Sequence, residues 1–323
     1  MLRCLGLTAA CIGLQFTDPA TFGIPDSLPF GLSQATVIHL IKWGLGAWTV
    51  LEANGVLNSW ADNRWAWGSD KKNWHWSKEI AVVTGGAAGI GACVVKKLVS
   101  HGIRVAVLDI GPLSKDFTAA ERQLIRYYRC DVTSRDDIHK AGLAIRSDLG
   151  SPSILINNAG IGNAYTILDI PTEALRKLFD INLISHWSTI QEFLPDMLAN
   201  KKGHIMSVAS LASFVALAGA VDYSATKAAL LALHEGLTQE LKHRYKCPQI
   251  KTTIVHPNWT KSAITAHEAL KAGLKEAGAS LLEPEVVADA MVKQIIAAKS
   301  GQIVLGPAVA PKIRAFPMWL QEI

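Results

Sequence analysis

The chain has 323 residues, of which 50% are hydrophobic, and its 32 basic and 27 acidic side chains give a net charge of +5. This length suits either one large α/β domain or a domain with a smaller appendage. The charges are spread along the chain without a basic block, so we expect no nucleic-acid binding. The five cysteines are scattered without a C-x-x-C pair, which predicts reduced thiols and neither a disulfide framework nor a metal site.

The first part of the chain is apolar and rich in tryptophan. Residues 1–16 place one Arg before an apolar run, as in a signal-type segment or a short anchor. A second apolar stretch, at 36–57, is interrupted by Lys42 and Glu52, whereas a clean membrane span needs about 20 apolar residues. Seven of the ten tryptophans lie between residues 43 and 76 among Lys and Arg, a composition typical of membrane interfaces. We predict membrane association; the alternative is an arm that packs against the following domain.

From residue 79 onward, short apolar runs alternate with helical stretches. This alternation predicts βαβ units and one doubly wound α/β domain with a seven-stranded parallel sheet. We expect the strands at residues 79–84, 104–110, 124–132, 153–160, 203–210, 251–257 and 301–306. The domain would then span residues 79–306, preceded by the apolar arm at 1–78 and followed by a short tail at 307–323.

The first expected strand runs into the glycine-rich stretch TGGAAGIG at 84–91. Glycines at the turn from a strand to a helix let backbone approach a phosphate, which the helix N-terminus then binds. Gly85, Gly89 and Gly91 supply this pattern, which indicates a Rossmann fold with a dinucleotide site; a tight turn is the alternative. Asp109, at the end of the second strand, can accept hydrogen bonds from a ribose diol and repel a 2′-phosphate, so NAD is favoured over NADP. Asp109 could instead be a solvated charge.

Four elements, in order, carry a family resemblance. They are Thr-Gly-x-x-x-Gly-Ile-Gly at 84–91, Asn-Asn-Ala-Gly at 157–160, Ser210, and Tyr-x-x-x-Lys at 223–227. Together they resemble the short-chain dehydrogenase/reductase family over residues 79–306. Segments such as HWSTIQEFLPDML and GHIMSVAS, with the apolar arm, look most like its membrane- and lipid-droplet-associated subgroup, which contains retinol dehydrogenase 10 and 17β-hydroxysteroid dehydrogenases 11 and 13. The resemblance implies a homo-oligomer on the endoplasmic reticulum or a lipid droplet, with the catalytic domain on the cytosolic side.

The Tyr-x-x-x-Lys motif places a phenol and an ammonium on one helix face, since residues four apart are neighbours. Hydride transfer from an alcohol also requires proton transfer at oxygen, and a phenol with a pKa near about 10 is a poor base at neutral pH. An adjacent ammonium lowers that pKa. We therefore predict Tyr223 as the general acid/base and Lys227 as its electrostatic partner, which the family also implies binds the nicotinamide ribose. Ser210 would stabilise the substrate oxygen; Ser207 is the alternative.

The resemblance implies further site residues. Asn182 would position a water in a proton relay to Lys227, or would simply satisfy helix backbone. The remaining cofactor contacts would come from Ile90, Asp131, Asn158, Thr260 and Ser262. For Asn157, a purely structural role and a cofactor contact both fit. The family's Pro-Gly after the sixth strand is here Pro257-Asn258, and Ser262 stands where Thr is usual. A substrate lid is expected at about residues 258–283, and His204, His234 and His256 are interpreted as core or surface residues.

These features predict an NAD(P)-dependent oxidoreductase that interconverts a secondary alcohol and a ketone on a lipophilic molecule such as a steroid, a retinoid, or a fatty or polyketide-like compound. Two alternatives remain at this point. One is an NADP-linked ketone reductase of a biosynthetic pathway. The other is a membrane-anchored cofactor-binding scaffold without turnover, which the intact Ser, Tyr and Lys set disfavours.

Overall fold

A computed structural model describes residue 6 and residues 33–66, 68–266, 271, 274–275, 278, 280–307 and 309–317. The chain divides into two compact units, residues 1–67 and 68–323. The expected anchor at 1–16 lies outside the described residues except for Gly6.

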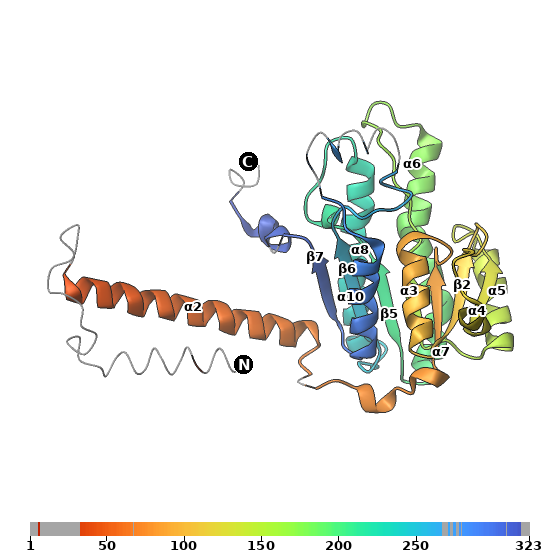
Figure 1. Cartoon of the computed structure of the whole chain (residues 1–323), viewed down its shortest axis with the longest axis horizontal. Helices are drawn as coiled ribbons and strands as arrows, with labels where there is room; N and C mark the ends of the chain where they lie inside the picture. The colour runs from red at the N-terminus through yellow and green to blue at the C-terminus, as the bar shows by residue number, and fades with distance from the viewer. Residues whose placement is uncertain are drawn as a thin grey trace. The chain divides into compact units, whose positions relative to one another are not determined.

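The first unit contains one long helix, α2 (Gln34–Asp62), drawn in orange in Figure 1. Its N-cap is Ser33, whose Oγ accepts a hydrogen bond from the backbone N–H of Thr36 at 3.2 Å, which satisfies one of the unpaired donors of the first turn. Among the residues that the structure describes, no helix is long and apolar enough to cross a membrane.

The second unit is built on a seven-stranded sheet in which every described strand pair is parallel, in the order β3-β2-β1-β4-β5-β6-β7 (Figure 1). The strands are β1 (Ile80–Thr84), β2 (Arg104–Asp109), β3 (Ile125–Arg129), β4 (Ile154–Asn157), β5 (His204–Val208), β6 (Lys251–Pro257) and β7 (Gly301–Leu305). The predicted doubly wound Rossmann fold is thereby confirmed.

Two predicted strands extend too far. The strand expected at 124–132 ends at Arg129, and the one expected at 153–160 ends at Asn157. In both places a backbone N–H group of the expected strand bonds to a side chain: Asp131 N–H donates to the Asp137 carboxylate at 3.3 Å, and Asn158 N–H donates to Thr84 Oγ1 at 3.0 Å. The apolar pattern continues past the point where the chain leaves the sheet.

Helices cover both faces of the sheet. On one face α3 (Gly89–Ser100) packs beside α10 (Pro284–Ile296), with Leu98 and Met291 fully buried (Figure 1). On the other face lie α5 (Arg135–Asp148), α7 (Ser185–Ala199) and α8 (Val221–His243), with Phe193 and Leu241 fully buried. The shorter helices are α4 (Ala119–Leu124) and α6 (Thr172–Phe179), and the last described turn is the 3-10 helix η7 (Ala310–Ala315).

The long helix expected between residues 171 and 200 is interrupted. Between α6 and α7 the chain forms a π-helical turn, η5 (Asp180–Ile184). Single π turns inside α-helices occur mostly at functional sites, because they shift the register of one side chain. Here the turn contains Asn182, which is fully buried.

The second unit begins before the expected boundary at residue 78. Trp74 is buried in the core of this unit and stacks on Trp76 with ring centroids 5.2 Å apart. Lys202 Nζ lies 4.8 Å from the centre of the Trp74 ring, and it also pairs with the buried carboxylate of Glu79. Trp74 and Trp76 therefore pack against the following domain, which was the alternative to membrane association.

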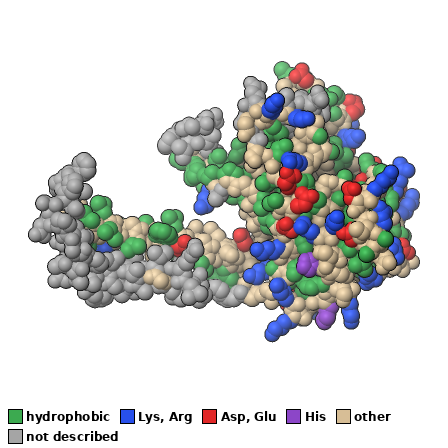
Figure 2. Space-filling view, viewed as in Figure 1, with side chains coloured by type: hydrophobic (Ala, Val, Ile, Leu, Met, Phe, Trp, Pro, Cys, Tyr) green, Lys and Arg blue, Asp and Glu red, His purple; other side chains and the backbone are tan. Residues whose placement is uncertain are grey.

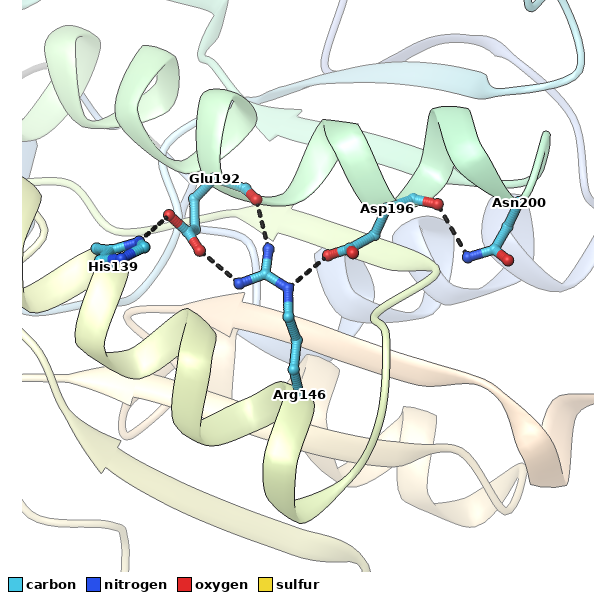
Figure 3. Close-up of polar contacts among 5 residues, drawn as sticks. All are labelled: His139, Arg146, Glu192, Asp196 and Asn200. Carbon is cyan, nitrogen blue, oxygen red and sulfur yellow. Dashed lines mark hydrogen bonds and ion pairs between the residues drawn. The ribbon is translucent and has the colours of Figure 1, made fainter.

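Helices α5 and α7 are joined by an ion-pair network around Arg146 (Figure 3). Its guanidinium donates to Glu192 Oε1 at 2.6 Å and to Asp196 Oδ2 at 2.8 Å. A Cβ at Gly142 would lie 2.2 Å from Glu192 Oε1, so the glycine leaves the space in which that carboxylate sits. The network fixes α7, and with it the C-terminal side of the π turn.

Candidate active site

A cavity of about 740 Å³ lies at the carboxyl ends of the strands, where ligands of doubly wound sheets bind. It brings together eleven predicted site residues: Gly85, Gly89, Ile90, Asp109, Asp131, Asn158, Ser210, Tyr223, Lys227, Thr260 and Ser262. Gly91 and Asn182, also predicted, are absent from its described lining. Both are buried behind it.

The glycine turn has the geometry of a phosphate cradle. Gly85 has φ +63°, and a Cβ there would lie 2.9 Å from Ala159 Cα. A Cβ at Gly91 would lie 2.1 Å from the Gly85 carbonyl oxygen, so Gly91 supports the turn from beneath. Helix α3 starts after Ala88, which provides no side-chain cap. The unpaired N–H groups of its first turn therefore suit an anion such as a pyrophosphate.

Asp109 anchors this turn. Its Oδ2 accepts the N–H of Ala87 at 2.9 Å, and its Oδ1 accepts the N–H of Gly111 at 2.9 Å. A carboxylate has about four acceptor positions, so two remain for a ribose diol. Asp131 lies farther along the same wall and accepts from Thr133 Oγ1 at 2.8 Å.

Thr84 was not predicted as a site residue and is absent from the described lining of the cavity, yet it joins the end of β1 to the chain that follows β4. Its hydroxyl accepts the N–H groups of Asn158 and Ala159, each at 3.0 Å. The Asn158 side chain donates back to the Thr84 and Gly85 carbonyls at 3.1 and 3.0 Å. Asn158 therefore lines the cavity while it holds the glycine turn, and the first position of the glycine motif, a threonine, was the available signal for Thr84.

Tyr223 and Ser210 meet at the other end of the cavity. Burial raises the pKa of the Tyr223 phenol to about 12, and a hydrogen bond with Ser210 opposes this rise. The expected lowering by Lys227 is not found. Lys227 Nζ instead donates to the carbonyl of Val208 at 2.9 Å and lies 5.4 Å from the centre of the Tyr223 ring.

Lys227 is buried, and burial lowers the pKa of its ammonium to about 8. A lysine that loses its hydration in this way is destabilising while it carries charge. Lys227 lines the same cavity as Ser210 and Tyr223, so its destabilising charge faces the space in which a molecule would bind.

Asn182 faces the backbone of the loop after β4. Its Oδ1 accepts the N–H of Ile161 at 2.8 Å, and its Nδ2 donates to the Ile161 carbonyl at 2.9 Å. Both ends of the amide are thus used to hold this loop, whereas the alternative expected them to satisfy helix backbone. Gly160, which sequence reasoning missed as an individual position, separates Asn182 from Lys227: a Cβ there would lie 3.5 Å from Asn182 Oδ1 and 3.8 Å from Lys227 Nζ.

The sequence profile of the short chain dehydrogenase family matches residues 79–272. The chain belongs to this family. Dehydrogenase RED2 of Cochliobolus heterostrophus is 42% identical over 183 residues, which are 57% of this chain and 68% of the relative. Human epidermal retinol dehydrogenase 2 is 30% identical over 249 residues, 76% of this chain and 77% of the relative. The predicted family and its oxidoreductase chemistry are thereby confirmed.

A solved structure gives the same fold. A metagenomic short-chain oxidoreductase in complex with NADP is 25% identical, with a TM-score of 0.58, and the match covers 72% of this chain and 98% of that one. NADP was observed in that neighbour, and the glycine turn of this chain has the geometry for a phosphate.

The segment after β6 departs from the family's usual sequence, and the structure shows how it is held. Thr260 Oγ1 donates to the Asn258 carbonyl at 2.8 Å, and Thr260 forms a β-bridge with Leu282. Thr265 Oγ1 accepts the N–H of Ser262 at 3.0 Å. Thr260 and Ser262 thus border the cavity on a side-chain-supported loop. The expected lid at 258–283 is described only in part, because residues 267–270, 272–273, 276–277 and 279 lie outside the described chain.

Replacing Lys227 by Met should stabilise this dehydrogenase at pH 7. A pKa of about 8 against 10.5 for an unhindered lysine corresponds to a cost of about 3 kcal/mol at pH values below 8. The Val208 carbonyl loses its donor, which costs about 1 kcal/mol. We expect the free energy of unfolding at pH 7, measured by chemical denaturation, to rise by about 1 to 3 kcal/mol.

The gain should depend on pH. The pKa of Lys227 is lower in the folded than in the unfolded chain. The destabilisation by its buried charge is therefore complete below pH 8, and it disappears as the pH rises to the pKa of the unfolded chain, 10.5. Lys227→Met should therefore lose its advantage between pH 8 and 10.5. Lys312→Met, on an exposed lysine, is the control. A variant that is less stable than the natural chain at pH 7, or a difference that stays constant with pH, would contradict the assignment.

Proposed function

We propose that this protein is an NAD-preferring alcohol/ketone oxidoreductase for a lipophilic substrate, with Tyr223 as the general acid/base. The observation that carries the proposal is that Ser210, Tyr223 and Lys227 line the same cavity as the glycine turn and Asp109. A cofactor site and a proton-transfer group that share one cavity are what hydride transfer requires.

In the oxidation direction, Tyr223 accepts the proton of the substrate hydroxyl while the hydroxyl-bearing carbon loses its hydrogen with both electrons, so that the C–O bond becomes a carbonyl. The nicotinamide, when bound, supplies the acceptor for that hydride. Ser210 donates a hydrogen bond to the substrate oxygen as negative charge develops there. In reduction the phenol of Tyr223 returns the proton, and Lys227, whose Nζ lies 5.4 Å from the centre of that ring, is a cation of the same cavity.

The substrate end of the cavity is apolar. Side chains from three separate segments form its wall: Leu211, Val215, Leu217, Trp259, Ile264 and Ile313. Arg314 holds the segment that carries Ile313, since its Nε donates to the Phe214 carbonyl at 3.0 Å. A wall of this kind favours a hydrophobic substrate, because apolar surface removed from water contributes about 25 cal/mol per Å². The similarity to a retinol dehydrogenase supports the same substrate class.

The test is nicotinamide reduction by the full chain in detergent, with NAD or NADP and a series of lipophilic secondary alcohols. Tyr223→Phe should lower kcat by a factor of about 100 or more, because it removes the general base, while cofactor binding remains. Tyr245→Phe, on an exposed tyrosine, should keep full activity.

Two outcomes would change the proposal. Turnover only in the direction of ketone reduction with NADP would favour the biosynthetic reductase. Cofactor binding without turnover on any alcohol or ketone would favour the scaffold.

The preference for NAD rests on Asp109. Among the described residues that line the cavity, Lys227 is the single cation, and it lies beside Tyr223 and not beside Asp109. A 2′-phosphate would therefore meet a carboxylate without a compensating charge.

Asp109→Asn should shift selectivity toward NADP. The amide keeps an acceptor for the backbone of the glycine turn but removes the charge that repels the phosphate, so we expect the ratio of kcat/KM for NADP to that for NAD to rise about 10- to 100-fold, or about 1.4 to 2.8 kcal/mol. Asp131→Asn, a second carboxylate of the same cavity, should change the ratio much less. An equal shift in both variants would show that Asp109 has no special place at the ribose.

We also propose that α2 lies on a membrane surface. Its exposed side chains include Leu40, Trp43, Trp48, Val50 and Leu51, with between 56% and 78% of their surface accessible. Figure 2 shows hydrophobic side chains along this helix with few charged ones among them. An apolar helix surface with tryptophans is suited to the interface between headgroups and acyl chains.

Flotation with phosphatidylcholine vesicles containing phosphatidylserine checks this proposal. The double variant Trp43→Ser/Leu51→Ser should lower the partition coefficient at least about tenfold, since each buried large apolar side chain contributes roughly 1.5 to 3 kcal/mol. Trp187→Ser, on an exposed tryptophan of α7 in the other unit, is the matched control and should bind as the natural chain does. Equal loss in both variants would argue against a specific role of α2.

A further inference from the structure

His256 is a buried histidine that the proposed chemistry does not use. It lies near the end of β6, is fully inaccessible, and does not border the described cavity. Its Nδ1 is 3.0 Å from the carbonyl oxygen of Ser210. A carbonyl is only an acceptor, so Nδ1 must carry the hydrogen and donate it.

The second ring nitrogen is also fixed. His256 Nε2 is 2.9 Å from the side-chain amide nitrogen of Gln302, and an amide NH₂ group is only a donor. Nε2 must therefore be the unprotonated acceptor. The two contacts agree on one neutral form of the ring, with hydrogen on Nδ1. Burial lowers the pKa of His256 to about 4, an effect to which the nearby charge of Lys227 adds and which the hydrogen bond to Ser210 opposes.

The sheet places the three residues together. Gln302 pairs with Ile254, two positions before His256, while His256 pairs with Val304. Side chains two apart in a strand share a face, so Gln302 and His256 are diagonal neighbours. The end of β5 is held to β6 by the bond from Ala209 N–H to the Val255 carbonyl at 2.8 Å, which brings Ser210 alongside the histidine.

We propose that His256, held in its Nδ1–H form by Gln302, is the positioning residue for Ser210. The inference rests on the proposed role of Ser210 in binding the substrate oxygen. Ser210 is extended, with φ −168° and ψ 164°, immediately before the 3-10 turn at Leu211–Ser213. Ser210 lies two residues beyond the end of β5. The His256 bond holds its carbonyl, and so the backbone from which the Ser210 hydroxyl projects, while that hydroxyl accepts the N–H of Ala212 at 3.2 Å.

The ring also steadies the turn that follows. His256 lies 4.5 Å from the ring of Phe214, with the two planes tilted by 39°. The Ser210 carbonyl accepts a second hydrogen bond, from Ser213 N–H at 3.0 Å. The histidine therefore contacts the catalytic segment at Ser210 and at Phe214, whereas the glycine turn and Asp109 lie at the other end of the cavity.

The decisive comparison is between His256→Asn and His256→Leu. The two side chains share the same branching at Cγ, but asparagine keeps an N–H donor near the place of Nδ1. We expect His256→Leu to lower kcat about 10- to 100-fold, as a small misplacement of a catalytic group does. The dissociation constant of the cofactor should be unchanged, and His256→Asn should recover most of kcat.

A double-mutant cycle separates positioning from general damage. In a Ser210→Ala background, His256→Leu should cause no further loss of kcat, because its effect passes through Ser210. His204→Leu removes another buried histidine, which bonds to Thr253 Oγ1 at 2.8 Å at the opposite end of β5; it should affect stability but not kcat. Multiplicative losses in the cycle, or an unchanged kcat in His256→Leu, would overturn the inference.

The tautomer of His256 can be measured directly. Nitrogen-15 NMR of the full chain, with His256→Asn to identify the signal, should show His256 protonated at Nδ1 and unprotonated at Nε2. Gln302→Met should release this preference. Protonation at Nε2 in the natural chain would overturn the inference even if catalysis is as proposed. Absence of turnover in the natural chain would instead reject the proposed function, and this inference with it.

Discussion

The structure depends on the junction between β1 and β4. At this place the strand order reverses direction, so the chain leaves β1 toward one face of the sheet and β4 toward the other, and a crevice opens between them. Thr84 closes the bottom of that crevice by accepting two N–H groups of the chain that follows β4. Asn158 returns two hydrogen bonds to the turn that follows β1. The cofactor cradle and the catalytic end of the cavity are therefore held to one another by a few polar contacts.

A second constraint is the buried charge of Lys227. Its ammonium has a backbone partner in the Val208 carbonyl, and Gly160 leaves space next to it. Burial acts on its neighbour Tyr223 in the opposite sense, since it raises the phenol pKa while it lowers the ammonium pKa. Burial thus favours the neutral form of both groups.

The fold and the cofactor end could be predicted because their physical causes lie in short stretches of sequence. A strand, a turn with glycines at Gly85 and Gly91, and a helix form one local unit, and Asp109 ends the adjacent strand. The strand limits were less accurate, because apolar residues at 130 and 132 continue the β3 pattern beyond the point where Asp131 turns the backbone. The π turn at Asn182 is a single turn, too short to produce a hydrophobic repeat that differs from that of the flanking α-helices. His256 was interpreted as an isolated core or surface residue, since neither Ser210 nor Gln302 is near it along the chain.

The substrate end differs in its physical origin. Its wall is assembled from side chains of the β5–α8 connection, the segment after β6, and the chain beyond β7, so that no local pattern specifies its shape. In the proposed function, the polar groups at the substrate oxygen are Ser210 and Tyr223, and Ser210 belongs to the same β5–α8 connection as part of this wall. Leu211 is the chain neighbour of Ser210, so a change in this part of the wall also bears on the backbone that carries the proposed substrate contact. The wall residues after β6 and β7 lie on other segments, and changes there are the ones that can alter substrate preference while the geometry at Ser210 is retained.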